Sequence, residues 1–147
     1  NLAELVREVV AALDGAPVVT QALATDLPLL PLDRTRMRLL LRNLLENALR
    51  HSAGASAAPQ VSLQRQGDGR VCLTVRDYGP GVPEDQLPNL AQPFYRPDAA
   101  RTRAEGGVGL GLYLCKLVAL AHGASFAVRN AGPGLLIEVM LPPLPHA

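Results

Sequence analysis

Hydrophobic side chains recur at helical spacing in three stretches of the chain. The first stripe predicts an amphipathic helix over residues 2–13. The second predicts a long helix from a cap at Asp33 to about His51, and its core-facing positions are Met37, Leu40, Leu41, Leu44, Leu45 and Ala48. The third predicts a helix over 108–122, which Gly123 ends as a C-terminal cap. Each helix can therefore bury one face against a sheet.

Alternating apolar and polar positions predict short strands over 18–23, around 61–63 and 71–75, and over 124–129 and 135–141. The turn at Gly67-Asp68-Gly69 joins the second and third strands into a hairpin, and the last two form a closing hairpin. A short helix is expected over 83–90. Helices mixed with antiparallel hairpins indicate an α+β fold, with one sheet and its helices on one face. Because no repeat or internal linker interrupts the pattern, residues 1–147 are expected to form one domain.

Composition and charge exclude several function classes. Fourteen basic and thirteen acidic residues give a net charge of +1, which argues against a nucleic-acid partner. Lys116 is the only lysine and lies between Cys115 and Leu117, so the chain has no P-loop. Cys72 and Cys115 form no CxxC pair and are expected to be inert buried thiols, which predicts neither a disulfide nor a zinc site.

The longest apolar run predicts neither a membrane span nor direct contact of this fragment with a membrane. It covers 107–121 and is shorter than the ~20 residues that a span needs. We therefore expect a soluble, cytoplasmic domain. The abrupt start of the chain suggests a piece of a longer protein.

A first polar cluster interrupts the long predicted helix. Asn43, Asn47 and Arg50 fall within about 60° of one another around the helix axis, with Glu46 and His51 beside them. Asparagine does not stabilise a helix interior, so another role should explain the pair. The plain alternative is a solvated polar edge.

Two further clusters are rich in glycine. Asp77 begins a turn over 77–81, where a carboxylate can accept a hydrogen bond from an exocyclic amine and glycines let the backbone approach a flat ring. The alternative is an ordinary turn in which Asp77 bonds its own backbone. Residues 106–111 open a helix, where free N–H groups favour a phosphate, although they can also act as a hinge. The dinucleotide-binding fingerprint fails there because position 112 is leucine.

Taken in order, the clusters resemble the nucleotide-binding boxes of sensor histidine kinases. Residues 33–52 resemble the N-box, 77–81 the G1 box, 93–96 the F-box and 107–112 the G2 box, and 134–142 resemble the final strand of the same domain. The resemblance covers essentially the whole chain, and four ordered motifs are far more specific than any one of them.

The resemblance implies the Bergerat ATP-binding fold, which gyrase-type and heat-shock ATPases share. This fold is a two-layer α/β sandwich with a mixed, mostly antiparallel sheet, helices on one face and a mobile lid over ATP. The implied function is to bind ATP with Mg²⁺ and to donate the γ-phosphate to a histidine on a separate dimerisation domain, in two-component signalling. The alternatives are an anti-sigma-type serine kinase, a non-catalytic nucleotide-binding module of the same fold and a gyrase-type ATPase.

Carried over by residue, the resemblance also implies roles at the site. Asp77 would accept from the adenine amine, and Asn47, supported by Asn43, would hold Mg²⁺ against the phosphates. Arg50 would contact a phosphate, which with Asn43 makes it a candidate catalytic residue, and His51 would lie near the base or sugar.

The remaining implied residues are glycines and the lid. Gly79 and Gly81 would shape the adenine pocket, and the phosphate cradle would be Gly107, Val108, Gly109, Leu110 and Gly111. The lid would span Phe94 to Gly107, and its candidate contacts to the γ-phosphate are Arg96, Arg101 and Arg103. Two departures from the family pattern are Val108, where Ser or Thr is common, and Ala91, which replaces the first aromatic of the F-box and is expected to loosen the packing that seats the lid.

No histidine here resembles the phosphate acceptor. His51, His122 and His146 are followed by serine, glycine and alanine, whereas the acceptor usually precedes an acidic residue. We therefore expect the partner to be the dimerisation domain of the same protein and, indirectly, a response regulator. The full-length protein is expected in the inner membrane with this domain on the cytoplasmic side. Asn43 stands where related ATPases carry a glutamate that acts as the general base, and Glu46 lies about 100° around the helix from Asn47, so ATP hydrolysis by this fragment should be very slow.

Overall fold

The computed structural model describes residues 1–15, 17–92 and 111–143. In these residues a five-stranded sheet has the order β1-β2-β3-β5-β4. The strands are β1 (Thr20–Leu23), β2 (Gln60–Arg65), β3 (Val71–Arg76), β4 (Ser125–Asn130) and β5 (Leu135–Leu141). The helices are α1 (Leu2–Ala11), α2 (Arg34–His51), α4 (Gly111–Ala121) and the short 3₁₀ helix η1 (Glu84–Asn89).

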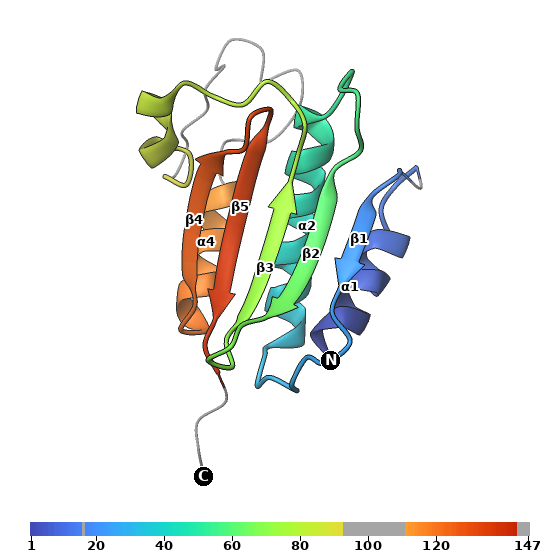
Figure 1. Cartoon of the computed structure of the whole chain (residues 1–147), viewed down its shortest axis with the longest axis vertical. Coiled ribbons are helices and arrows are strands. Elements are labelled where there is room, and N and C mark those ends of the chain that lie inside the picture. Colours follow the sequence, from blue (N-terminus) through green and yellow to red (C-terminus); the bar gives the residue numbers. More distant parts are fainter. Residues whose placement is uncertain (16, 93–110, 144–147) are drawn as a thin grey trace.

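The sheet is mixed and mostly antiparallel, as the sequence predicts. Only β1 and β2 run parallel, whereas β2–β3, β3–β5 and β4–β5 are antiparallel. The helices α1, α2 and α4 lie together against one face of this sheet (Figure 1). The described part of the chain is therefore a two-layer α+β sandwich, which confirms the predicted fold class.

The core lies between α2 and the inner face of the sheet. The stripe predicted on the long helix is buried as expected, from Met37 to Ala48. It packs in one cluster with the inward residues of the strands, which are Val61, Leu63, Val71, Leu73, Val75, Ile137, Val139 and Leu141. On the outer face, Ser62 hydrogen bonds Thr74 and Arg129 pairs with Glu138, although Cys72, Leu136 and Met140 lie on the same face.

The helices α2 and α4 pack side by side in opposite directions. Near the end of α4, His122 Nε2 accepts a hydrogen bond of 3.0 Å from the backbone N–H of Asp33, which caps the start of α2. At the other end, Gly111 lies near Asn43. The antiparallel arrangement brings the beginning of α4 beside Asn43, the first residue of the polar cluster on α2.

Several predicted boundaries move by a few residues. The first helix ends at Ala11 rather than at 13, and β1 begins at Thr20 because its pairing with β2 begins there. The segment predicted as a helix over 83–90 is a 3₁₀ helix, which is consistent with Pro88 inside it, since proline donates no backbone hydrogen bond. The third helix is confirmed from Gly111 to Ala121, and Gly123 has a φ of +72° as expected of a cap.

Both cysteines are buried, as predicted. Burial raises the pKa of the Cys115 thiol to about 12, and its Sγ lies 3.5 Å from the carbonyl oxygen of Leu40. Burial also raises the pKa of Cys72, with Glu138 as a second cause. Both thiols are therefore protonated near neutral pH. In the described ranges, none of the helices is long and apolar enough to cross a membrane.

Candidate functional site

The predicted polar clusters meet at one end of the sheet, where α2 and β3 end and α4 begins (Figure 1). His51, the last residue of α2, places Nδ1 3.6 Å from Oδ2 of Asp77, which follows β3. The next residue, Ser52, accepts a hydrogen bond of 3.4 Å from the backbone N–H of Tyr78. The start of α4 lies beside α2: a Cβ on Gly111 would be 4.0 Å from Oδ1 of Asn43. Segments far apart in sequence thus form one site.

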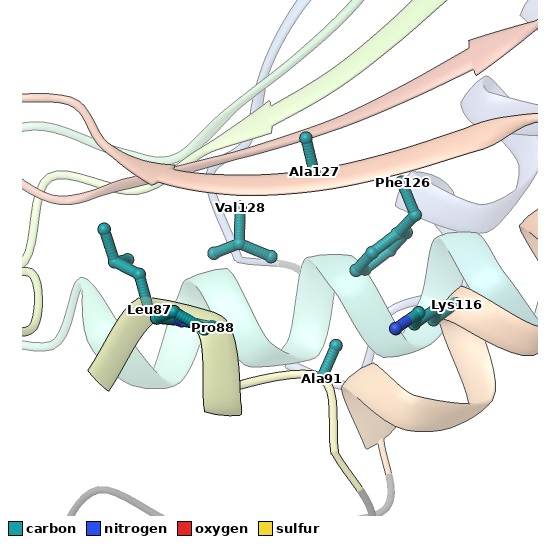
Figure 2. A pocket seen from close by; sticks show the side chains of 7 residues that line it. All are labelled: Leu87, Pro88, Ala91, Lys116, Phe126, Ala127 and Val128. Carbon is teal, nitrogen blue, oxygen red and sulfur yellow. The ribbon is translucent and has the colours of Figure 1, made fainter. Parts of the chain in front are cut away.

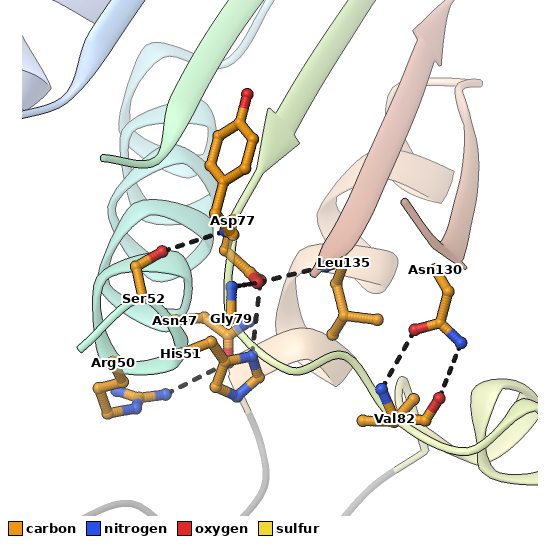
Figure 3. A network of polar contacts seen from close by, with 10 residues as sticks. Asn47, Arg50, His51, Ser52, Asp77, Gly79, Val82, Asn130 and Leu135 are labelled. Carbon is orange, nitrogen blue, oxygen red and sulfur yellow. Dashed lines mark hydrogen bonds and ion pairs between the residues drawn. The ribbon is translucent and has the colours of Figure 1, made fainter. Parts of the chain in front are cut away.

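Asp77 is a buried carboxylate with two differently occupied oxygens (Figure 3). The residue is only 2% exposed. Its Oδ1 accepts hydrogen bonds from the backbone N–H groups of Gly79 at 3.0 Å and Leu135 at 3.2 Å. The bond to Gly79 is the local bond expected of an ordinary turn, and the bond to Leu135 ties the turn to β5. Oδ2 faces His51 instead.

Gly79 and Gly81 are required by close packing of the protein itself. A Cβ on Gly79 would overlap the carbonyl oxygen of His51. Gly81 has a φ of +73°, and a Cβ there would lie 2.6 Å from Oδ1 of Asn130. Any larger residue at either position would push the turn away from α2 or β4. The turn is glycine-rich because it is wedged between two other segments.

Asn47 is the buried member of the cluster on α2. It is 9% exposed, so a plain solvated edge is the wrong interpretation for this residue. Its Oδ1 accepts a long hydrogen bond of 3.5 Å from Arg50, and its buried Nδ2 has no hydrogen-bond partner in the described part of the chain. Because an unsatisfied buried polar group costs roughly 1–3 kcal/mol, this amide is poised for a polar ligand or water. Asn43 is half-buried and Arg50 is exposed beside it.

Glu46 points away from this site. Its Oε2 pairs with Nε of Arg42 at 3.5 Å, and the side chain lines a hollow between α1 and α2 with Val9 and Leu13. Asn43, one turn earlier, has its Oδ1 toward Gly111 of α4 instead. The structure therefore agrees with the expectation that Glu46 is poorly placed to act as a base near Asn43.

Some predicted residues lie outside the described ranges. These are the lid arginines and most of the phosphate cradle, namely Arg96, Arg101, Arg103, Gly107, Val108, Gly109 and Leu110. Gly111 alone of the cradle is described, as the first residue of α4. The roles of the others stay predictions, as does the lid.

Ala91 lies next to the end of the described range 17–92. It faces a hollow of about 300 Å³ between η1, α4 and β4 (Figure 2). The lining is mainly apolar and consists of Leu87, Pro88, Ala91, Lys116, Phe126, Ala127 and Val128. A larger side chain at position 91 would enter this hollow. The geometry is consistent with the expected loss of packing where the family carries an aromatic residue.

The sequence did not identify three residues that hold the site together. Asn130 bonds the backbone of Val82, and Leu135 donates to Asp77. Gly134, with a φ of +86°, packs so closely on Asp77 that a Cβ would lie 2.6 Å from the carbonyl carbon of that residue. Gly134 opens the stretch 134–142 that resembles the final strand of the family, but its contact with Asp77 has no local sequence signal.

Comparisons with known proteins agree with this geometry. The family described as "Histidine kinase-, DNA gyrase B-, and HSP90-like ATPase" matches residues 32–145. The alginate biosynthesis sensor protein KinB of Pseudomonas aeruginosa is 44% identical over 82% of this chain and 19% of its own length. The signal transduction histidine-protein kinase BaeS of Escherichia coli is 42% identical over 75% of this chain and 23% of its own length. The chain thus spans about a fifth of these relatives.

Solved structures show the same fold. The mycobacterial sensor histidine kinase MprB superposes with a TM-score of 0.78 at 26% identity, over 99% of this chain and 97% of that one. The nucleotide-free catalytic domain of the histidine kinase ThkA gives a TM-score of 0.77 at 25% identity, over 99% and 96% of the two chains. The chain belongs to the family of histidine kinase-, DNA gyrase B- and HSP90-like ATPases, and its relatives place it among the ATP-binding domains of two-component sensor kinases.

Proposed function

We propose that this chain is the catalytic domain of a sensor histidine kinase, extends over residues 1–147, and transfers the γ-phosphate of ATP to a histidine on another domain of the same protein. The observation that carries the proposal is the convergence of Asp77, Asn47 and the start of α4 at one end of the sheet. Although the family match begins at residue 32, α1 shares the core and β1 pairs with β2, so both belong to the same domain.

The adenine ring would bind beside the turn that follows β3. Oδ2 of Asp77 would accept from the exocyclic amine, because Oδ1 is already held by two backbone N–H groups. His51 would lie at the edge of the base or the sugar, since its ring is next to that carboxylate. A charged acceptor makes a stronger hydrogen bond than a neutral one, which favours adenine over bases without an amine at that place.

The phosphates would lie between α2 and the beginning of α4. Mg²⁺ takes oxygen ligands and is commonly held by one or two protein groups together with phosphates and water. The amide oxygens of Asn47 and Asn43 fit that limited requirement. No group of three or more His, Cys, Asp or Glu that could hold a metal occurs in residues 1–15, 17–92 and 111–143. When bound, the ion would neutralise phosphate charge, and Arg50 would add a positive charge beside Asn47.

Direct hydrolysis of ATP would be slow at this site. The side chain nearest the start of α4 on α2 is Asn43, and an amide is not a general base at neutral pH. Glu46 is paired with Arg42 and faces the hollow beside α1. The γ-phosphate would therefore await a histidine nucleophile, and docking of that histidine would supply much of the rate by proximity.

The partner would be the dimerisation domain that carries the acceptor histidine. The matched region makes up only 19% and 23% of the curated relatives, so they contain other domains. The outward face of α4 exposes Leu114, Leu117 and Leu120, a stripe that a helix facing only water would not carry. This stripe suits an apolar helical partner. A response regulator would receive the phosphate afterwards, and the whole protein would lie in the inner membrane with this domain in the cytoplasm.

Two measurements test the proposal. Calorimetric titration with ATP, with and without Mg²⁺, should show binding that the ion strengthens. Radiolabelled ATP should give acid-labile phosphate on the separately produced dimerisation domain only when this chain is added. Acid-stable label on a serine would instead favour an anti-sigma-type kinase, and ATP binding without transfer would favour a non-catalytic module.

A further inference from the structure

Asn130, the last residue of β4, hydrogen bonds the backbone of Val82 through both the oxygen and the nitrogen of its side-chain amide (Figure 3). Its Oδ1 accepts a hydrogen bond of 3.1 Å from the N–H of Val82, and its Nδ2 donates one of 2.7 Å to the carbonyl oxygen of the same residue. Nδ2 also lies 3.2 Å from Oε1 of Glu84, at the start of η1. The side chain therefore satisfies a donor and an acceptor of one peptide segment at once, as a neighbouring strand would.

The turn and Asn130 are fitted to each other. At Gly81, the residue before Val82, a Cβ would come within 2.6 Å of Oδ1 of Asn130. Gly81 also needs its positive φ of +73° to turn the chain toward β4. Because glycine leaves this space open, the amide can reach the backbone of Val82. The position of the turn is thus determined by a residue 48 places later in the sequence.

The same hairpin holds the other end of the turn. Leu135, at the start of β5, donates to Oδ1 of Asp77, and Gly134 packs against the backbone of Asp77. In the loop between Asn130 and Gly134, the carbonyl oxygens of Ala131 and Pro133 each lie 3.3 Å from Nη2 of Arg76. The β4–β5 hairpin therefore supports the segment from 76 to 82 at both of its ends.

We propose that Asn130 is a positioning residue for nucleotide recognition: through Val82 it fixes the turn that forms the adenine side of the site. This inference rests on the proposed function. Asn130 acts on the turn and not on the nucleotide, so its loss should impair discrimination between bases more than contact with the phosphates.

The test uses Asn130→Asp, a nearly isosteric change. The new carboxylate keeps an acceptor for the N–H of Val82 but loses the donor to its carbonyl oxygen, and it faces Glu84 as a like charge. Because the carboxylate also repels the carbonyl oxygen of Val82, the turn should separate from β4 more often. We therefore expect about tenfold faster amide hydrogen exchange at Val82 and a roughly tenfold smaller ratio of ATP to GTP affinity, the size that one lost hydrogen bond implies. A partly unfolded sample would lower both affinities equally and leave this ratio unchanged.

A rescue and a control complete the design. Adding Glu84→Gln to Asn130→Asp removes the like charge and supplies an amide donor, so part of the lost ratio should return. Ser125→Ala, at the exposed far end of β4, should leave both the ratio and the Val82 exchange as in the parent chain. If the parent chain binds ATP and Asn130→Asp keeps its ratio, the positioning role is wrong. If the parent chain does not bind ATP, the proposed function fails, and the role with it.

Discussion

Replacing Asp77 by asparagine should separate nucleotide binding from folding. The two backbone N–H groups of Gly79 and Leu135 need an oxygen at the Oδ1 position, and an asparagine side chain can provide it. The amide NH₂ must then take the place of Oδ2, beside His51. It would point a donor at the adenine amine, which is itself a donor, so the base would lose its partner.

The sizes of the two effects follow from these contacts. Hydrogen bonds to a charged group contribute about 1 kcal/mol more than neutral ones, but removing a buried charge relieves its desolvation. The free energy of unfolding should therefore fall by only about 1 kcal/mol, or roughly 2–4 °C in melting temperature for a chain of this size. An unpaired amine in the site costs roughly 1–3 kcal/mol, which weakens ATP binding roughly 5- to 150-fold.

Isothermal titration with ATP and Mg²⁺ measures the first effect, and thermal unfolding measures the second. Asp68→Asn is a matched control, because Asp68 is an exposed turn carboxylate that bonds Arg70 away from the site. It should leave the affinity for ATP unchanged. Equal affinity in the Asp77→Asn variant would remove Asp77 from the binding site. A fall in melting temperature of more than about 10 °C would show that the charge itself is structural.

Three further changes test other parts of the structure. Gly134→Ala should lower the free energy of unfolding in urea by roughly 2–5 kcal/mol, because it combines a positive φ with overlap on Asp77; no loss would show that the hairpin can relax. Ala91→Phe should fill the hollow beside η1 and raise that free energy by roughly 1–2 kcal/mol, whereas a loss would mean that the hollow is too narrow for a ring. Arg38 is the main cause that lowers the pKa of Glu8, so this carboxylate stabilises the folded chain above its usual pKa and loses that effect as pH falls through the lowered value. Glu8→Gln should therefore flatten the decline of stability in acid, and an unchanged acid limb would contradict the pairing.

The helices and the inner face of the sheet could be predicted because their hydrophobic periods are local. The stripe from Met37 to Ala48 specifies both a helix and its buried side, and the structure confirms both. The parallel pairing of β1 with β2 could not be predicted, since it joins strands separated by the whole of α2. Register of that kind depends on packing and not on any local pattern.

In the site, too, residues with a local sequence pattern could be predicted and residues that act through distant contacts could not. Asp77 and Asn47 were found because they belong to ordered motifs, and the structure places both in buried positions at the same end of the sheet. Asn130 was missed because an asparagine at the end of a strand resembles any turn residue, and its partner Val82 is distant in sequence. The residues expected to meet a ligand were thus predictable, while a residue that holds them in place was not.

The opposite directions of α2 and α4 give the site an electrical polarity. Peptide dipoles add along a helix, so its beginning carries a partial positive charge and its end a partial negative charge. At this end of the sheet α2 finishes at His51, whereas α4 starts beside Asn43, so the positive end of α4 lies about two helical turns before the negative end of α2. A molecule with an anionic end and an amine-bearing end would experience a field that turns the anion toward α4 and the amine toward the end of α2. Because this effect fades within a turn of each helix end, it would favour one orientation of a nucleotide that has already entered the site.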